Sequence, residues 1–243
     1  MIYVSLTIIP ERVKNLSKTV NSLLSQKKEP DKIFINVPKK YQRFNEIIED
    51  NQIPQFNSEK VEVVRCEDCG PGTKILGSID KMEKDSMVIL VDDDNIYEDY
   101  MIEKFLYFFK KAPNNAYSFY VHPLGNFGVG QGADGFAINT SYLEGIYDFY
   151  NKVVKNYKEL FLHDDLWISY FLYFIKKNKI LSLQEHLKNN NDVKSSLIYR
   201  SHIDSPGLIS NYGTNLNEAV VRRDKIALKS LKYMIDKTKN LVF

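Results

Sequence analysis

Apolar residues recur along the first half of the chain in two alternating patterns. Apolar runs at residues 2–9, 32–37 and 87–91, and an alternating run at 60–65, predict β-strands. Residues 13–24 carry apolar side chains at helical spacing, and residues 74–82 and 98–111 are also predicted to be helical. Alternating strands and helices favour an α/β fold, with an open, mostly parallel sheet and helices on both faces.

The second half of the chain is less regular. Residues 116–121 and 136–138 predict strands, and residues 140–150, 164–177 and 219–239 predict helices. Glycine clusters within residues 125–135, which predicts a loop, and the polar residues 187–196 predict another. We expect the whole chain, residues 1–243, to form a single domain.

Composition narrows the possible functions. Of 243 residues, 44% are hydrophobic, enough for a packed core, and a net charge of +2 gives no reason to expect nucleic-acid binding. The chain starts with a predicted strand where a signal peptide would lie, and no apolar run is long enough to span a membrane. Cys66 and Cys69 form a lone C-x-x-C, which we interpret as two reduced thiols. These features indicate a cytoplasmic protein.

Three carboxylates, Asp92-Asp93-Asp94, directly follow the apolar strand at 87–91. Ligands in open α/β sheets bind at the carboxyl ends of strands. Asp92 and Asp94 point the same way in extended backbone, and a hard divalent cation would relieve their repulsion while taking further oxygens from substrate phosphates. The alternative is an acidic loop that caps the next helix.

Two other segments carry candidate chemistry. Gly70-Pro71-Gly72-Thr73-Lys74 could bring a ligand close to the backbone and offer a helix N-terminus and a lysine to an anion, or could be a plain strand-to-helix turn. His163-Asp164-Asp165 opens a very apolar helix, where Asp164 could simply be the N-cap.

These segments together resemble GT-A glycosyltransferases. The run Ile-Leu-Val-Asp92-Asp93-Asp94 is similar to their apolar strand that ends in an Asp-x-Asp or Asp-Asp-Asp motif. Residues 7–12, Thr-Ile-Ile-Pro-Glu-Arg, resemble the opening segment that contacts the nucleotide base in several branches. Residues 68–74 are similar to a D-x-G-P-x-T-K segment of some bacterial and large-virus sugar transferases.

The resemblance implies a Rossmann-like GT-A fold, with a nucleotide-binding half at 1–115 and an acceptor half plus terminal helix at 116–243. It implies a hexosyltransferase-like enzyme that moves a sugar from a nucleotide-sugar donor, usually a UDP-sugar, to a glycan or other hydroxyl acceptor. The implied cofactor is Mn²⁺ or Mg²⁺, bound by Asp94 and Asp92 and completed by His202. Donor contacts are expected from Thr7, Pro10, Arg12, Asp68, Lys74, Asp92, Asp93 and Asp134. Asp165 occupies the position of the general base of inverting members.

Other functions stay open at this point. A haloacid-dehalogenase-like phosphatase would need its acidic motif near the chain start, and a sugar nucleotidyltransferase would need a glycine- and arginine-rich opening. A carbohydrate- or nucleotide-binding domain that lost its chemistry is a third alternative. The basic residues of the predicted helix 219–239 suggest, at most, weak contact with an anionic membrane surface.

Overall fold

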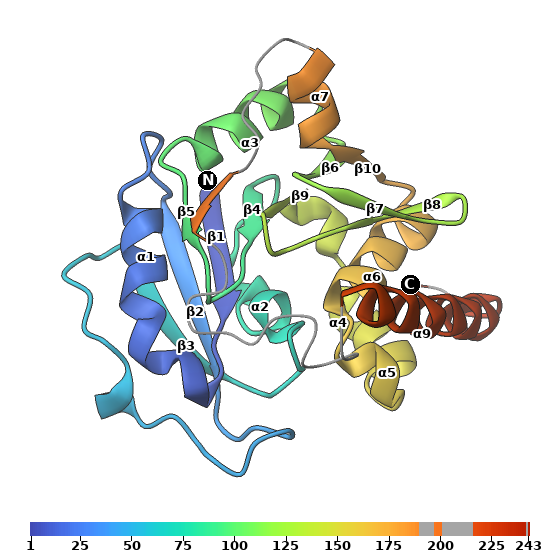
Figure 1. Ribbon diagram of the computed structural model, residues 1–243, viewed down its shortest axis with the longest axis horizontal. Helices are drawn as coiled ribbons and strands as arrows, with labels where there is room; N and C mark the ends of the chain where they lie inside the picture. Colours follow the sequence, from blue (N-terminus) through green and yellow to red (C-terminus); the bar gives the residue numbers. More distant parts are fainter. Residues whose placement is uncertain (190–196, 201–215, 242) are drawn as a thin grey trace.

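The computed structural model describes residues 1–189, 197–200, 216–241 and 243. Its main sheet has seven strands in the order β10-β6-β9-β4-β1-β2-β3 (Figure 1). The strands are β1 (Ile2–Thr7), β2 (Lys32–Pro38), β3 (Val61–Cys66), β4 (Met87–Leu90), β6 (Asn115–Ser118), β9 (Phe136–Asn139) and β10 (Lys179–Ser182). Strand β9 runs antiparallel to β4 and β6, and the other pairs are parallel. The expected open, mostly parallel sheet is confirmed.

Helices cover both faces of this sheet (Figure 1). On one face lie α1 (Leu16–Leu24), α3 (Met101–Lys111) and α7 (Leu183–Asn189). On the other lie α2 (Thr73–Leu76), α4 (Ile146–Phe149), α5 (Lys158–Phe161), α6 (Asp164–Tyr170) and α9 (Leu216–Thr238). The sheet therefore separates two hydrophobic cores.

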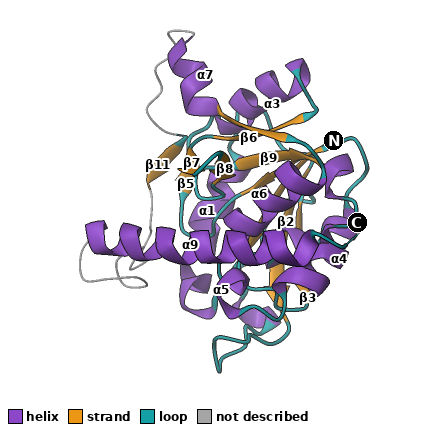
Figure 2. Cartoon of the chain, turned by 90° about the vertical axis from the view of Figure 1, so that its right-hand side faces the viewer, coloured by secondary structure: helices purple, strands orange, loops and turns teal. Residues whose placement is uncertain are grey.

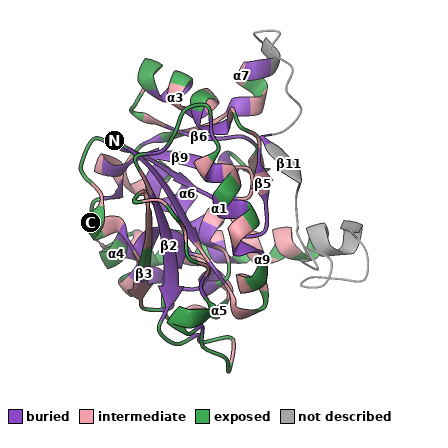
Figure 3. Ribbon diagram, turned by 90° about the vertical axis from the view of Figure 1, so that its left-hand side faces the viewer, coloured by how far each residue is buried: buried purple, intermediate pink, exposed green. Residues whose placement is uncertain are grey.

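Strand alternation assigns side chains to these two cores. Val4 and Ile89 pack with the residues of α1 and α3, whereas Val88 and Leu90 pack with those of α2, α4 and α6. All four are at most 1% exposed, because the sheet centre is covered on both sides (Figure 3). An uninterrupted apolar run at β4 follows from this double burial.

The glycine-rich segment is not a plain loop, so that prediction was wrong. It contains β8 (Phe127–Gly130), which pairs with β7 (Val121–Leu124) in an antiparallel hairpin. A Cβ at Gly128 would lie 2.7 Å from Val121, and one at Gly130 would lie 2.8 Å from the Phe136 ring. These glycines therefore lie within a strand, where they let neighbouring residues pack closely against its backbone.

Several helices are shorter than predicted. Helix α2 ends at Leu76 and is followed by a 3₁₀ turn, Ile79–Lys81. Gly77, the C-cap residue of α2, packs against Asn36, where a Cβ would approach within 2.6 Å. The predicted helix 140–150 divides into a 3₁₀ turn, Thr140–Leu143, and α4, with Gly145 between them at φ 82°. Helix α6 continues as a π-helix through Phe171–Ile175, so the long prediction there was sound.

The structure also contains features that the sequence pattern did not predict. Strand β10 was not predicted, and α7 occupies the start of the predicted loop at 187–196, of which residues 190–196 lie outside the described residues. Strand β3 lies at the sheet edge and is not a neighbour of β4, although β1 is. A short sheet pairs β5 (Ile96–Tyr97) with β11 (Ile198–Arg200).

Shortening one buried side chain of β4 tests whether this strand is covered on both faces of the sheet. Ile89→Ala should lower the free energy of unfolding by about 2–5 kcal/mol, because a fully buried side chain leaves a cavity. Urea denaturation measures the change. Ile47→Ala is the matched control, since Ile47 is 48% exposed, and equal losses in the two variants would contradict the assignment of Ile89 to the core.

Candidate active site

The acidic run lies at the carboxyl edge of the sheet centre. Strand β1 pairs in parallel with β4, so the segments that follow the two strands leave the same edge. The segment after β1 carries Arg12, and the segment after β4 carries Asp92, Asp93 and Asp94. The fold thereby brings a guanidinium group to three carboxylates.

Arg12 holds two of these carboxylates. Its Nη1 lies 2.7 Å from Asp93 Oδ1 and 3.3 Å from Asp94 Oδ2. Asp93 also accepts a hydrogen bond from the Ile9 backbone N–H, at 3.3 Å. Burial raises the pKa of Asp93 to about 6 even though Arg12 opposes that rise. Arg12 therefore helps to keep this buried carboxylate charged at neutral pH.

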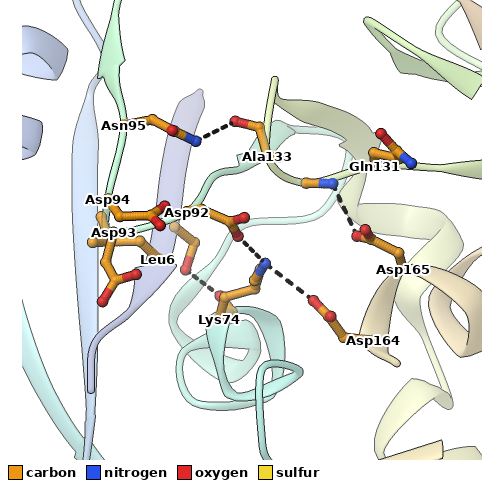
Figure 4. A network of polar contacts seen from close by, with 12 residues as sticks. Leu6, Lys74, Asp92, Asp93, Asp94, Asn95, Gln131, Ala133, Asp164 and Asp165 are labelled. Carbon is orange, nitrogen blue, oxygen red and sulfur yellow. Dashed lines mark hydrogen bonds and ion pairs between the residues drawn. The ribbon is translucent and has the colours of Figure 1, made fainter. Parts of the chain in front are cut away.

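Lys74 links the acidic run to the start of α6 (Figure 4). Its Nζ lies 2.6 Å from Asp92 Oδ1 and 3.1 Å from Asp164 Oδ2, and its side chain is only 5% exposed. Burial disfavours the ammonium, yet the charges of Asp164 and Asp92 raise the pKa of Lys74 well above its ordinary value. Helix α2, which follows β3 in the chain, is short and buried, and it places Lys74 next to the carboxyl ends of the central strands. Although β3 lies at the edge of the sheet, the segment that follows it therefore still reaches Asp92 through Lys74.

Asp164 does not cap its helix as the alternative interpretation held. His163 is the N-cap residue and makes no side-chain capping bond, whereas the Asp164 side chain turns to Lys74. The neighbouring Asp165 accepts a 2.9 Å hydrogen bond from the Gly132 backbone N–H. Burial, and then the charge of Asp164, raise the pKa of Asp165 well above that of an ordinary carboxyl.

Gly132 fits tightly between these charged groups. A Cβ at this position would lie 3.0 Å from Lys74 Nζ and 3.4 Å from Asp165 Oδ1. The adjacent Ala133 carbonyl accepts hydrogen bonds from Asn95 Nδ2 at 2.9 Å and from the Tyr97 hydroxyl at 3.0 Å. The segment between β8 and β9 is thus fixed to the end of β4, and its backbone positions Asp165.

The carboxylates could supply two ligands to a divalent cation. Asp93 points away from Asp92 and Asp94 in Figure 4, consistent with its contacts to Arg12 and Ile9. No three His, Cys, Asp or Glu residues gather as a metal site within the described part of the chain. Mg²⁺ and similar ions often take one or two carboxylates and complete their shell with substrate phosphates. Asp92 and Asp94 suit that kind of site, and not an all-protein site.

The comparisons with known proteins agree with this geometry. A family model described as glycosyl transferase family 2 matches residues 8–176, more than two thirds of the chain. The chain belongs to glycosyl transferase family 2. The matched segment contains Arg12, Lys74, the acidic run and both residues of the Asp164-Asp165 pair. Family membership confirms the resemblance and supports glycosyl transfer as the broad class of activity.

Three solved structures are similar to this chain at low identity. A 2-C-methyl-D-erythritol 4-phosphate cytidylyltransferase of Francisella tularensis is 14% identical, with a TM-score of 0.46, over 78% of this chain and 97% of that one. S. aureus TarS is 14% identical, with a TM-score of 0.48, over 75% of this chain and 58% of that one. A TarS structure in complex with UDP is 13% identical, with a TM-score of 0.45, over 70% and 56%. No curated protein matches the chain.

The remaining predicted donor contacts are distributed around the same edge. Thr7 ends β1 and donates a 3.0 Å hydrogen bond to the Asn36 carbonyl, and Pro10 begins a 3₁₀ turn, Pro10–Asn15. Asp68 is buried and accepts backbone N–H groups from Gln42 at 2.6 Å and Gly70 at 2.9 Å. These bonds tie the segment after β2 to the turn before α2, so the structure shows a positioning role for Asp68.

The two remaining predicted residues are Asp134, a donor contact, and His202, a metal ligand. Asp134 is half-buried in the segment between β8 and β9, two positions from Gly132. His202, the predicted third metal ligand, lies outside the described residues. Their donor and metal roles stay predictions.

A cavity of about 260 Å³ opens beside Asp165. Its walls come from β7, β8, the start of α6, and α9, and the chargeable side chains among them are His122, His163, Asp164, Asp165, Arg223 and Asp224. Arg223 and His122 both contact Asp224, at 3.0 and 3.2 Å. Sequence analysis gave His122 and Arg223 no role, because only the folded chain brings β7 and α9 together.

Removing the charge of Lys74 should destabilise the domain. Lys74→Met leaves Asp164 buried without its cation and should lower the free energy of unfolding by about 3–5 kcal/mol. Lys81→Met breaks the exposed ion pair with Glu62 and should leave the free energy of unfolding nearly unchanged. Thermal and urea unfolding compare the two variants. Equal, small losses would show that Lys74 is not a buried counter-ion.

Proposed function

We propose that this domain is a metal-dependent glycosyltransferase that uses a nucleotide-sugar donor, a UDP-sugar by preference, and inverts the anomeric centre. One observation carries the proposal. Carboxylates from the end of β4 and from the start of α6 lie on two sides of one site, joined by Lys74 and separated by the Gly132 backbone. This arrangement offers separate groups for the leaving diphosphate and for the attacking hydroxyl.

The donor side is formed by the acidic run. Asp94 and Asp92 would hold Mn²⁺ or Mg²⁺, and the ion would supply charge stabilisation to the departing diphosphate. Arg12 and Lys74 limit the repulsion among the carboxylates before any ligand binds. UDP is proposed because it is the usual nucleotide at the Asp-x-Asp site that this sequence resembles.

The acceptor side is formed by the cavity next to Asp165. A sugar hydroxyl is a poor nucleophile until a base removes its proton in the transition state. Asp165 lines the cavity, and its raised pKa makes it a stronger base than an exposed aspartate. The Gly132 N–H fixes one carboxylate oxygen, Oδ1. Attack from the cavity side, opposite the diphosphate, gives an inverted product.

Metal dependence is tested by nucleotide binding. Calorimetry should show UDP binding in the presence of Mn²⁺ and its loss on addition of EDTA, because two carboxylates need a cation to hold a diphosphate. Asp94→Asn should remove the metal-dependent part of the affinity. Asp99→Asn is the matched control, since Asp99 is exposed and its carboxylate pairs with Lys27 on the protein surface. UDP affinity that is unchanged by EDTA would refute the metal proposal.

The base is tested by isosteric replacement. Asp165→Asn should lower turnover by about 10²–10⁴-fold while UDP binding is retained, because the positioned base is lost and the donor side is intact. Asp148→Asn is a surface control, since Asp148 is exposed and pairs with Lys152. A donor screen that measures nucleotide-sugar hydrolysis with Mn²⁺ would identify the substrate for the assay. Full activity in Asp165→Asn, or retention of the anomeric configuration, would exclude this assignment.

The pH profile provides an independent readout of the same residue. The base works only when ionised, so kcat/KM should fall as pH drops through the pKa of Asp165. Because burial and Asp164 raise that pKa, the fall should begin at a higher pH than for an ordinary aspartate. The acid limb should disappear from the residual activity of Asp165→Asn.

A further inference from the structure

The outer face of α9 carries an exposed apolar stripe. Val221, Leu228 and Ile235 are 69%, 53% and 38% exposed, and they follow one another at intervals of seven residues. Seven residues make close to two helical turns, so the three side chains form one line along the helix. Figure 2 shows α9 lying across one side of the molecule.

Positive charge surrounds this stripe. Over residues 221–239 the exposed charged side chains are Arg222, Lys225, Lys229, Lys232, Asp236, Lys237 and Lys239. Asp236 is the single exposed acid among them, and Lys239 lies 2.7 Å from it. Lys229 lies 3.4 Å from Glu159 of α5. Lys225, Lys232 and Lys237 make no ion pair with the described residues, so this face of α9 stays cationic.

The inner face of α9 already secures the helix to the domain. Ser230 and Met234 are fully buried, and the Tyr233 ring stacks on Tyr157 with centroids 4.0 Å apart. The Tyr170 hydroxyl lies 2.6 Å from Thr238 Oγ1. These contacts hold the helix without Val221, Leu228 or Ile235, so packing among the described residues does not account for the apolar stripe.

We propose that the outer face of α9 binds an anionic membrane surface. Helices that lie in a membrane interface combine an apolar stripe, which enters the acyl boundary, with Lys and Arg side chains that reach anionic headgroups. Both features occur here on one face. A second copy of this chain would bring an equally cationic face against the first, so self-association through α9 is electrostatically disfavoured.

Docking in this way would set the orientation of the active site. Arg223, Asp224 and Ala227, on another side of the same helix, line the cavity beside Asp165. Asp224 is one helical turn from Leu228, so the stripe and the cavity lie on adjacent sides of one helix. Membrane binding does not depend on the proposed sugar transfer, and the two can be tested separately.

Vesicle co-sedimentation of the full chain tests the proposal. The protein should pellet with vesicles of phosphatidylcholine and phosphatidylglycerol in equal amounts, and should stay in solution with phosphatidylcholine alone. Leu228→Glu should weaken binding at least about tenfold, because an apolar side chain is lost and a like charge is added to the anionic surface. Lys225→Gln with Lys232→Gln should weaken it roughly fivefold per lysine, and added salt should weaken wild-type binding.

Tyr107→Glu is the matched control, because Tyr107 is also 53% exposed and lies on a helix, α3, outside this face. It should bind vesicles like the wild type, and thermal unfolding should show that every variant is folded. Wild-type protein that does not pellet with the anionic vesicles would overturn the proposal, as would unaltered binding by Leu228→Glu. A dimer in sedimentation velocity that Leu228→Glu dissociates would assign the face to a second copy instead. Mn²⁺-dependent UDP binding by the same variants reports on the donor site independently.

Discussion

The candidate active site depends on one buried ammonium group, that of Lys74. Lys74 Nζ lies between Asp92, at the end of β4, and Asp164, at the start of α6, and without it two elements from different parts of the chain would meet through like charges. Burying a charge is costly unless it is paired, so Lys74 and its carboxylates require one another. This mutual requirement holds α6 at the sheet edge, and with it Asp165.

A second cation, Arg12, divides the carboxylates of the site into two groups with different partners. Arg12 neutralises Asp93 and contacts Asp94, whereas Lys74 serves Asp92 and Asp164. The three adjacent carboxylates are consequently not equivalent, although they are identical in sequence. The Gly132 backbone lies close to both Lys74 and Asp165, because this residue has no side chain. A few groups therefore separate the carboxylates at the end of β4 from Asp165 at the start of α6.

Local patterns predicted the main strands and helices of the first half of the chain but not the contacts between them. Strand β4 and its acidic run were predictable because an apolar strand followed by carboxylates is a local signal. The pairing of Lys74 with Asp164 has no such signal, since it depends on how α2 and α6 pack under the sheet. Gly128 was misinterpreted because a glycine required for close strand packing looks the same in sequence as one in a loop. The resemblance predicted Asp165 as the general base, but the cavity beside this residue is visible only in the folded chain.

The position of β9 has a consequence for how the chain folds. This strand inserts between β4 and β6, so the sheet centre is completed by residues that are synthesised after most of the parallel strands. An emerging amino-terminal portion would present β4 as an open edge, with unpaired backbone groups that invite intermolecular pairing. Closing that edge requires a long-range contact, which is slow to form. Ribosome-bound intermediates of this protein should therefore need shielding by chaperones until the antiparallel strand arrives.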